Sequence, residues 1–190
     1  MSEIDPQAEF DTRVNHLLQT TCEVARTLVG AHQTAMAMVI GGDWGTARKY
    51  FSLSEKYEQW GDFTMPARGI GLHALVVGRN EALRLTQNEV EAHPDWRAYA
   101  ESAGKHPPLR GLLAVPIVGE DGLNYGLLQA SDKTDGREFD EDDERRLRSL
   151  AAAAAVGLDA LRKVRALRTG QPAPASLVDA LPTFVVIESA

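Results

Sequence analysis

"SDKTDGREFDEDDERRL", from Ser131 to Leu147, places one lysine among acidic residues, between an apolar segment and a long alanine-rich one. A calcium-binding EF-hand loop needs oxygen ligands at its first, third and fifth positions and a glycine at its sixth. If Gly136 takes the sixth position, Lys133 falls on the third, where it cannot serve as a ligand. The stretch is therefore not predicted to bind calcium.

The acidic residues are instead typical of a helix start. Asp140 is the predicted N-cap, and the three acids after it lie where the positive end of the helix dipole favours anions. Lys133 ends the preceding strand and can reach back to Asp143, while Phe139 is expected to close the loop against the core. We therefore predict an ion pair that ties strand, loop and helix together.

The segments around this stretch predict the rest of the fold. Two apolar strands precede it, at 110–119 and 125–133, and the short turn between them makes them antiparallel neighbours. The helix after it is expected to run to about Arg168 and to end before Gly170. Its predicted inward stripe consists of Leu147, Leu150, Ala151, Ala154, Leu158, Leu161 and Val164.

The first half of the chain shows both helical and strand periodicity. We predict an amphipathic helix at 9–29, a hairpin from strands at 34–40 and 46–53, a helix within 69–80, a short extended piece at 82–86, and two short helical turns in 87–102 separated at Pro94.

One domain is expected from a chain of 190 residues. We assign residues 1–8 to a disordered N-terminus, 9–168 to the domain, and 169–190 to a Pro/Ala linker with a short apolar tail. The tail segment at 183–188 could also add a strand to the sheet edge.

Composition excludes several classes of protein. The net charge of −7 argues against nucleic-acid binding, and the basic cluster at 162–168 suits a helix C-terminus. No signal peptide is visible, and no apolar run approaches the length of about 20 residues that a membrane span needs. We therefore expect a cytoplasmic protein without nucleic-acid or membrane partners.

Chemistry-bearing motifs are missing from the sequence. The single cysteine, Cys22, excludes an intramolecular disulfide and a cysteine-based zinc site, and we expect it to be a small core residue. The five histidines show no metal-binding spacing, and no hydrolase or phosphate-loop motif occurs. We predict no catalytic residue, no metal ligand and no enzymatic activity.

Asp132, Lys133, Phe139, Asp143 and Glu144 follow the order of the Asn-Lys-x(n)-Phe-x(3)-Asp-Glu signature of GAF domains, with aspartate in place of its asparagine. The stretch "HPPLRGLLAVPIVGEDGLNYGLLQASDK" also resembles the two central strands of that family, and "RRLRSLAAAAAVGLDALR" resembles its closing helix. The chain looks like a GAF subgroup of bacterial signalling proteins that occurs beside PAS and histidine-kinase modules.

The resemblance implies an α+β sandwich. A central antiparallel sheet of about six strands would carry the terminal helices on one face, and short helices and loops would form a pocket on the other. It also implies a structural latch made of Asp132, Lys133, Phe139 and Asp143. Mapped onto this chain, aromatic walls and a few donors would form the ligand site: Trp60, His73, Trp96, Tyr99, His106, Arg110 and Ser131. Alternatively, the tryptophans are core residues under long loops and Arg110 is a surface residue.

Two functions remain open at this point. The first is a non-catalytic sensor that regulates signal transduction by binding a small molecule of unknown identity and relaying it through its terminal helices. The second is an interaction module with a vestigial pocket. In either case we expect a homodimer through the terminal helices, because five consecutive alanines at 151–155 allow another helix to approach closely. We also expect a kinase or another signalling protein as a further partner. GAF enzymes that reduce methionine sulfoxide use several cysteines, and bilin-binding members use one in the domain body; Cys22 fits neither pattern. The sequence leaves the identity of any cofactor unknown.

Overall fold

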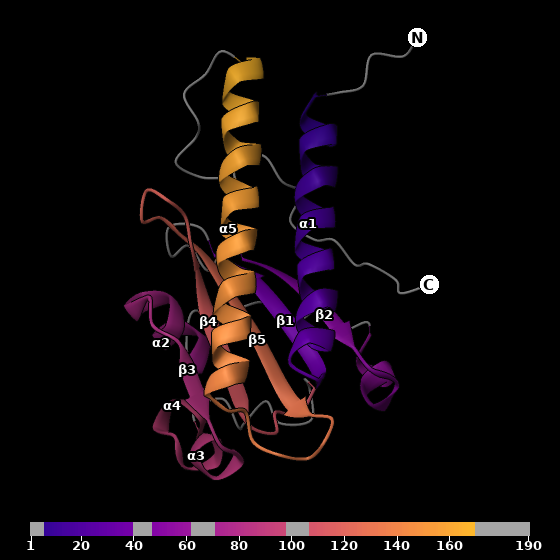
Figure 1. The fold of residues 1–190 in the computed structure, drawn as a ribbon, viewed down its shortest axis with the longest axis vertical. Coiled ribbons are helices and arrows are strands. Elements are labelled where there is room, and N and C mark those ends of the chain that lie inside the picture. Colours follow the sequence, from indigo (N-terminus) through magenta and orange to yellow (C-terminus); the bar gives the residue numbers. More distant parts are fainter. Residues whose placement is uncertain (1–5, 40–46, 62–70, 98–106, 170–190) are drawn as a thin grey trace.

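The computed structural model describes residues 6–39, 47–61, 71–97 and 107–169. Two long helices, α1 (Pro6–Leu28) and α5 (Glu141–Thr169), lie side by side in opposite directions across one face of an antiparallel sheet (Figure 1). The expected α+β sandwich is confirmed. Within the described residues, no helix is both long and apolar enough to cross a bilayer.

The sheet contains five strands in the order β2-β1-β5-β4-β3, and every neighbouring pair is antiparallel. We expected about six strands; one candidate for a further strand, at 183–188, lies outside the described residues, as do residues 1–5 and all of 170–190. The strands are β1 (Ala31–Met38), β2 (Arg48–Leu53), β3 (Leu83–Leu85), β4 (Leu112–Val118) and β5 (Asn124–Lys133).

The predicted hairpins are confirmed, with shifted ends. β1 begins three residues before the expected start because Gly30, at φ +59°, turns the chain directly out of α1. α1 itself begins at Pro6, within the segment expected to be disordered. Proline is tolerated there because an N–H in the first helical turn would have no intrahelical partner.

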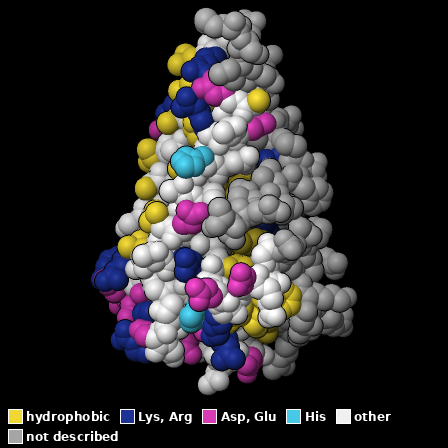
Figure 2. Space-filling view, turned by 90° about the vertical axis from the view of Figure 1, so that its right-hand side faces the viewer, with side chains coloured by type: hydrophobic (Ala, Val, Ile, Leu, Met, Phe, Trp, Pro, Cys, Tyr) yellow, Lys and Arg dark blue, Asp and Glu magenta, His cyan; other side chains and the backbone are white. Residues whose placement is uncertain are grey.

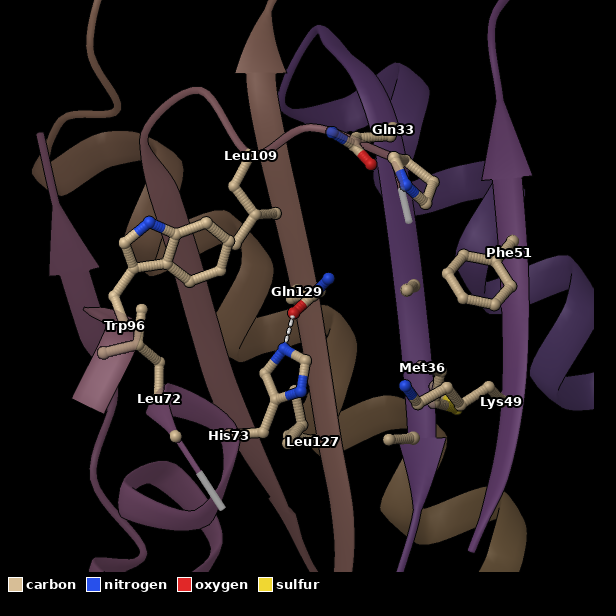
Figure 3. Close-up of a pocket in the computed structure, with 14 residues that line it drawn as sticks. Gln33, Met36, Lys49, Phe51, Leu72, His73, Trp96, Leu109, Leu127 and Gln129 are labelled. Carbon is tan, nitrogen blue, oxygen red and sulfur yellow. Dashed lines mark hydrogen bonds between the residues drawn. The ribbon is translucent and has the colours of Figure 1, made fainter. Parts of the chain in front are cut away.

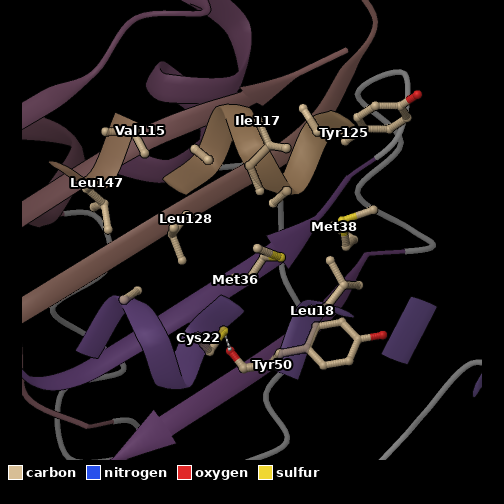
Figure 4. Close-up of a cluster of buried hydrophobic side chains, with 14 of the residues drawn as sticks. Leu18, Cys22, Met36, Met38, Tyr50, Val115, Ile117, Tyr125, Leu128 and Leu147 are labelled. Carbon is tan, nitrogen blue, oxygen red and sulfur yellow. Dashed lines mark hydrogen bonds between the residues drawn. The ribbon is translucent and has the colours of Figure 1, made fainter. Parts of the chain in front are cut away.

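The main core lies between the sheet and the two long helices. Alternate side chains of the strands point toward α1 and α5, among them Met36, Tyr50, Val115 and Leu128 (Figure 4). Cys22 lies inside this cluster, and burial raises the pKa of its thiol far above the usual value. This cysteine is a packing residue, as the sequence indicated.

α5 follows the predicted stripe except at its end. Leu147, Ala151, Ala154 and Leu158 are buried, but Val164 is 46% exposed. The prediction was wrong there because α1 and α5 extend beyond the end of the sheet, where none of the described strands covers them (Figure 1).

The small residues of α5 are partly used inside the chain. Ala154 and Ala155 belong to the main core. A Cβ atom added at Gly157 would lie 2.9 Å from Leu17 Cδ2 of α1. Part of the alanine-rich surface therefore allows close approach of the chain's own N-terminal helix, and only Ala152 and Ala153 of the alanine run are exposed.

Short helices cover part of the opposite face of the sheet. They are α2 (Leu72–Arg79), α3 (Gln87–Ala92) and α4 (Pro94–Arg97), and a 3₁₀ segment, η3 (Glu55–Trp60), follows β2. Thr86 and Glu89 form a capping box that starts α3. The predicted break at Pro94 is confirmed, since α4 begins at that residue. Side chains of α2, α3 and α4 pack on Leu112, Ala114 and Leu127. Among the described residues, a pocket lies beside them over β1, β2 and β5.

Candidate functional site: a pocket over the sheet

A pocket lies on the sheet face that α1 and α5 do not cover. β1, β2 and β5 supply its floor, and α2, α4 and the segment at 107–109 supply its wall (Figure 3). Its empty volume, including the open mouth, is about 690 Å³. Small-molecule sites in proteins are typically concave and lined mainly by apolar side chains with a few polar groups, as this one is.

Two alanines create the hollow. Side chains alternate along a strand, so Ala35 and Ala37 of the central floor strand, β1, point into the pocket. Ala35 lies between Phe51 of β2 and Gln129 of β5, and Ala37 lies between Lys49 of β2 and Leu127 of β5. Long side chains on both sides of two methyl groups leave a trough along β1.

Lys49 places an ammonium group in this trough. Its side chain leaves β2 and its nitrogen points toward β1 and the pocket (Figure 3). Burial lowers the pKa of Lys49 from its usual 10.5 to about 8. No carboxylate or other acceptor within the described residues pairs with this nitrogen. Lys49 therefore carries its charge at neutral pH in surroundings that do not compensate it.

A hydrogen bond between α2 and β5 orients the polar groups of the floor. His73 Nε2 donates to Gln129 Oε1, because an amide oxygen can only accept (Figure 3). The amide nitrogen of Gln129 consequently points away from His73, into the pocket. On the neighbouring strand, Gln33 Nε2 donates to the Pro108 carbonyl at 2.6 Å, which fixes that side chain at the upper rim.

The predicted ligand residues are only partly brought together. His73 and Trp96 line the pocket. Trp60 lies at the end of η3, outside the set of described residues that line the pocket, and Arg110 is exposed just before β4. Ser131 is buried against the residues just before β4, where its hydroxyl accepts from Arg110 N at 2.9 Å and donates to Gly111 O at 2.8 Å. Tyr99 and His106 lie outside the described residues.

The sequence did not predict that Lys49, Phe51, Gln129, Gln33 and the two floor alanines would line the pocket. One signal was present in the alternation of "RKYFSL", which puts Lys49 and Phe51 on one strand face. Another was Gln129, a polar residue that lies between Leu128 and Ala130 in the apolar part of β5. Neither pattern shows by itself which face borders a cavity.

The acidic helix start has the expected contacts. Lys133 Nζ donates to Asp143 Oδ2 at 2.6 Å, and the two side chains are only 8% and 5% exposed. Asp140 Oδ1 accepts from the backbone N–H groups of Asp142 and Asp143, as an N-cap does. Phe139 is buried in the main core. The end of β5 and the start of α5 are thus joined through buried polar and apolar contacts.

Asp132 belongs to a different junction from Lys133. Its carboxylate accepts from the Tyr57 hydroxyl at 2.7 Å and from Lys56, both on η3. Burial acts to raise the pKa of Asp132, but the hydrogen bonds from Lys56 and Tyr57 outweigh it, and the pKa lies below the usual 3.8. Its φ of +59° is a left-handed conformation that aspartate and asparagine tolerate better than most residues. Aspartate can therefore occupy this position of the signature in the backbone conformation that the structure shows.

Comparison with known proteins agrees with this architecture. A family model described as GAF domain matches residues 11–159. The fold is similar to that of the blue-light absorbing form of the PixJ GAF domain from Thermosynechococcus elongatus, at 14% identity and a TM-score of 0.62, over 88% of this chain and 96% of that chain.

Two further solved structures belong to different functional contexts. One is the GAF domain of a phosphoenolpyruvate-protein phosphotransferase from Coxiella burnetii, at 19% identity and a TM-score of 0.56, over 87% of this chain and 99% of that chain. The other is a type II free methionine-R-sulfoxide reductase from Thermoplasma acidophilum, at 18% identity and a TM-score of 0.57, over 80% of this chain and 96% of that chain. At such identities the similarity shows a shared fold.

Proposed function

This chain belongs to the GAF domain family, and we propose that it is a non-catalytic sensory module of bacterial signal transduction that binds a small molecule in the pocket over its sheet. The domain would run from the start of α1 to the end of α5, slightly beyond the expected 9–168, and would be followed by a linker and tail. The observation that carries the proposal is the trough over Ala35 and Ala37, which is bordered by aromatic, aliphatic and polar side chains. A vestigial pocket would be expected to fill with larger side chains at these floor positions.

The single cysteine of the chain lies away from this pocket. The single cysteine of the chain, Cys22, is buried on α1, on the sheet face opposite the pocket. It cannot reach a ligand over β1 without passing through the sheet. Cysteine-based sulfoxide reduction and covalent chromophore attachment at Cys22 are therefore not part of the proposal.

β5 offers a direct route from the pocket to the C-terminal helix. Gln129 lies in the pocket floor, and Lys133, four residues later on the same strand, is bonded to Asp143 at the start of α5. Farther along α5, Asp159 accepts from the Tyr125 hydroxyl of β5 and, at 2.9 Å, from Glu120 N. A ligand that moves Gln129 would therefore act on a strand held to α5 at two points. The receiving partner is proposed to be a kinase or another signalling protein.

A pocket-filling variant tests the proposal. Purified protein is screened by thermal shift and native mass spectrometry against nucleotides, cyclic nucleotides, amino acids and small organic acids. A compound present at 100 times its dissociation constant should stabilise the fold by about 2.7 kcal/mol. Ala35→Leu should remove the response by filling the trough, whereas Ala153→Leu on the exposed face of α5 should keep it. An equal response in both variants would place binding elsewhere.

A second candidate function, dimerisation, rests on the exposed apolar residues. Among the described residues, all large hydrophobic side chains that are exposed belong to α1 and α5: Val24, Leu28, Val156, Val164 and Leu167. Figure 2 shows hydrophobic side chains following the left edge of the molecule, on the outer side of the helices. We propose that the terminal helices pair two chains there, with α5 contributing Val156 and Leu167, which are 69% and 84% exposed.

A further inference from the structure

We propose that the pocket selects an anionic small molecule, a monocarboxylic acid with a compact aromatic or branched apolar body, whose carboxylate is held by Lys49 and the amide of Gln129. This inference rests on the proposed function, since it names the chemical class of the ligand for the same pocket.

The charge of the lining points to an anion. Lys49 is the only lysine or arginine among the described lining residues, and these include no aspartate or glutamate. A half-buried ammonium group is stabilised by a counter-charge, and no described residue supplies one to Lys49. A bound anion would remove this deficit and would return the lowered pKa of Lys49 toward its usual value.

The donors fit a carboxylate better than a phosphate ester. Lys49 supplies one positive charge, and the Gln129 amide nitrogen supplies neutral donors that His73 orients toward the pocket. A carboxylate carries one negative charge, which this pair can match. A phosphate ester carries close to two charges and three acceptor oxygens, which normally requires several cations or a row of backbone N–H groups.

The remaining walls fit an apolar body. Phe51 and Trp96 face the pocket from opposite sides (Figure 3), and Leu72, Leu109 and Leu127 contribute aliphatic surface between them. Over the floor, Ala35 and Ala37 leave room for a ring or a branched chain. Aromatic side chains favour stacked or edge-on rings at close range. The arrangement therefore separates an anionic end at Lys49 from an apolar end near Trp96.

The experiment compares matched acids and amides. Benzoate, phenylacetate and indole-3-acetate are each titrated at pH 7 against their primary amides, which keep the shape and lose the charge. Calorimetry or ligand-detected NMR gives the dissociation constants, and inorganic phosphate and acetate are measured alongside. At least one of the three acids is expected to bind at least about tenfold more tightly than its amide, the effect of a charge-assisted hydrogen bond.

Variants assign the effect to the lysine. Lys49→Met keeps the length of the side chain and should weaken binding of that acid about tenfold or more while leaving the amide within about twofold. Lys163→Met, at an exposed lysine of α5, should leave both unchanged. Circular dichroism establishes that each variant is folded.

The outcomes distinguish this inference from the broader proposal. The anion assignment is overturned if acid and amide bind with equal affinity, or if Lys49→Met still prefers the acid. Binding in the pocket stands in either case if Ala35→Leu abolishes binding of both the acid and the amide. Tighter binding of phosphate than of any acid overturns the carboxylate assignment in favour of a phosphate ligand. No response to any of the three acids at millimolar concentration overturns the inference, and a positive response in the broader screen would then retain only the sensory role.

Discussion

Removing the charge of Lys133 should destabilise the protein far more than removing that of a surface lysine. In Lys133→Met the apolar stem is retained, so the change isolates the ammonium group. Asp143, only 5% exposed, is then left without its ion-pair partner. Breaking one side of a buried ion pair typically costs about 3–5 kcal/mol. Asp143 keeps the N–H of Asp140 at 3.1 Å and its place at the helix N-terminus, which offset part of this cost. We expect a loss of about 2–4 kcal/mol.

Urea unfolding at 25 °C and pH 7 measures this loss. With a slope of about 2 kcal/mol per molar urea, the midpoint should fall by about 1–2 M without a change of slope. Asp143→Asn should cost a similar amount, and the double variant should lose clearly less than the sum of the two single losses.

Lys163→Met is the matched control for Lys133→Met. Lys163 pairs with Glu120, but the two side chains are 56% and 62% exposed, so its urea midpoint should stay within the error of the wild type. A Lys133→Met midpoint within the error of the wild type, or strictly additive single losses, would refute the reasoning that this pair holds β5 to α5.

Three further predictions follow from the same structure. Between pH 8 and 10.5 the unfolded chain keeps a proton on Lys49 that the folded chain has lost, so the stability of the wild type relative to Lys49→Met should rise through this window. At pH 7 Lys49→Met should be more stable than the wild type by about 1–3 kcal/mol in urea unfolding. Gly126→Ala should cost at least about 3 kcal/mol or prevent folding, because at φ +135° the added Cβ would lie 1.9 Å from Ala37 O, and a soluble variant with a native midpoint would contradict this. In light scattering the wild type should be a dimer and Val156→Arg a folded monomer, whereas Ala92→Arg, at an exposed position of α3, should remain a dimer. A wild type that is monomeric at high micromolar concentration would exclude the helix pairing.

The dimer prediction also shows where the sequence misled. Ala154 belongs both to the predicted inward stripe and to the alanine run expected to admit a second helix, and in the structure it is only 2% exposed within a single chain. An arginine at that position would disrupt the main core and would therefore not report on assembly. Alanine-rich helix surfaces allow close packing, yet their spacing cannot tell whether the partner is the chain's own N-terminal helix or another molecule.

Local spacing in the sequence determined much of the fold. The β4–β5 hairpin, the end of α3 before Pro94 and the N-cap at Asp140 follow from turn length, ring geometry and side-chain capping, which act over a few residues. The contact between Lys133 and Asp143 could also be predicted from the sequence, because only a short loop separates the end of the strand from the start of the helix. Such features need no knowledge of distant parts of the chain.

The pocket depended on the tertiary structure alone. Lys49, His73 and Gln129 come from β2, α2 and β5, and the hydrogen bond between the last two spans 56 residues. Their meeting requires the register that sets Ala37 between Lys49 and Leu127, together with helices that cover one part of the sheet face and, among the described residues, leave a pocket over another. Alternation along β2 fixes which side chains share a face, but whether that face meets core, solvent or a cavity is decided by what packs against it.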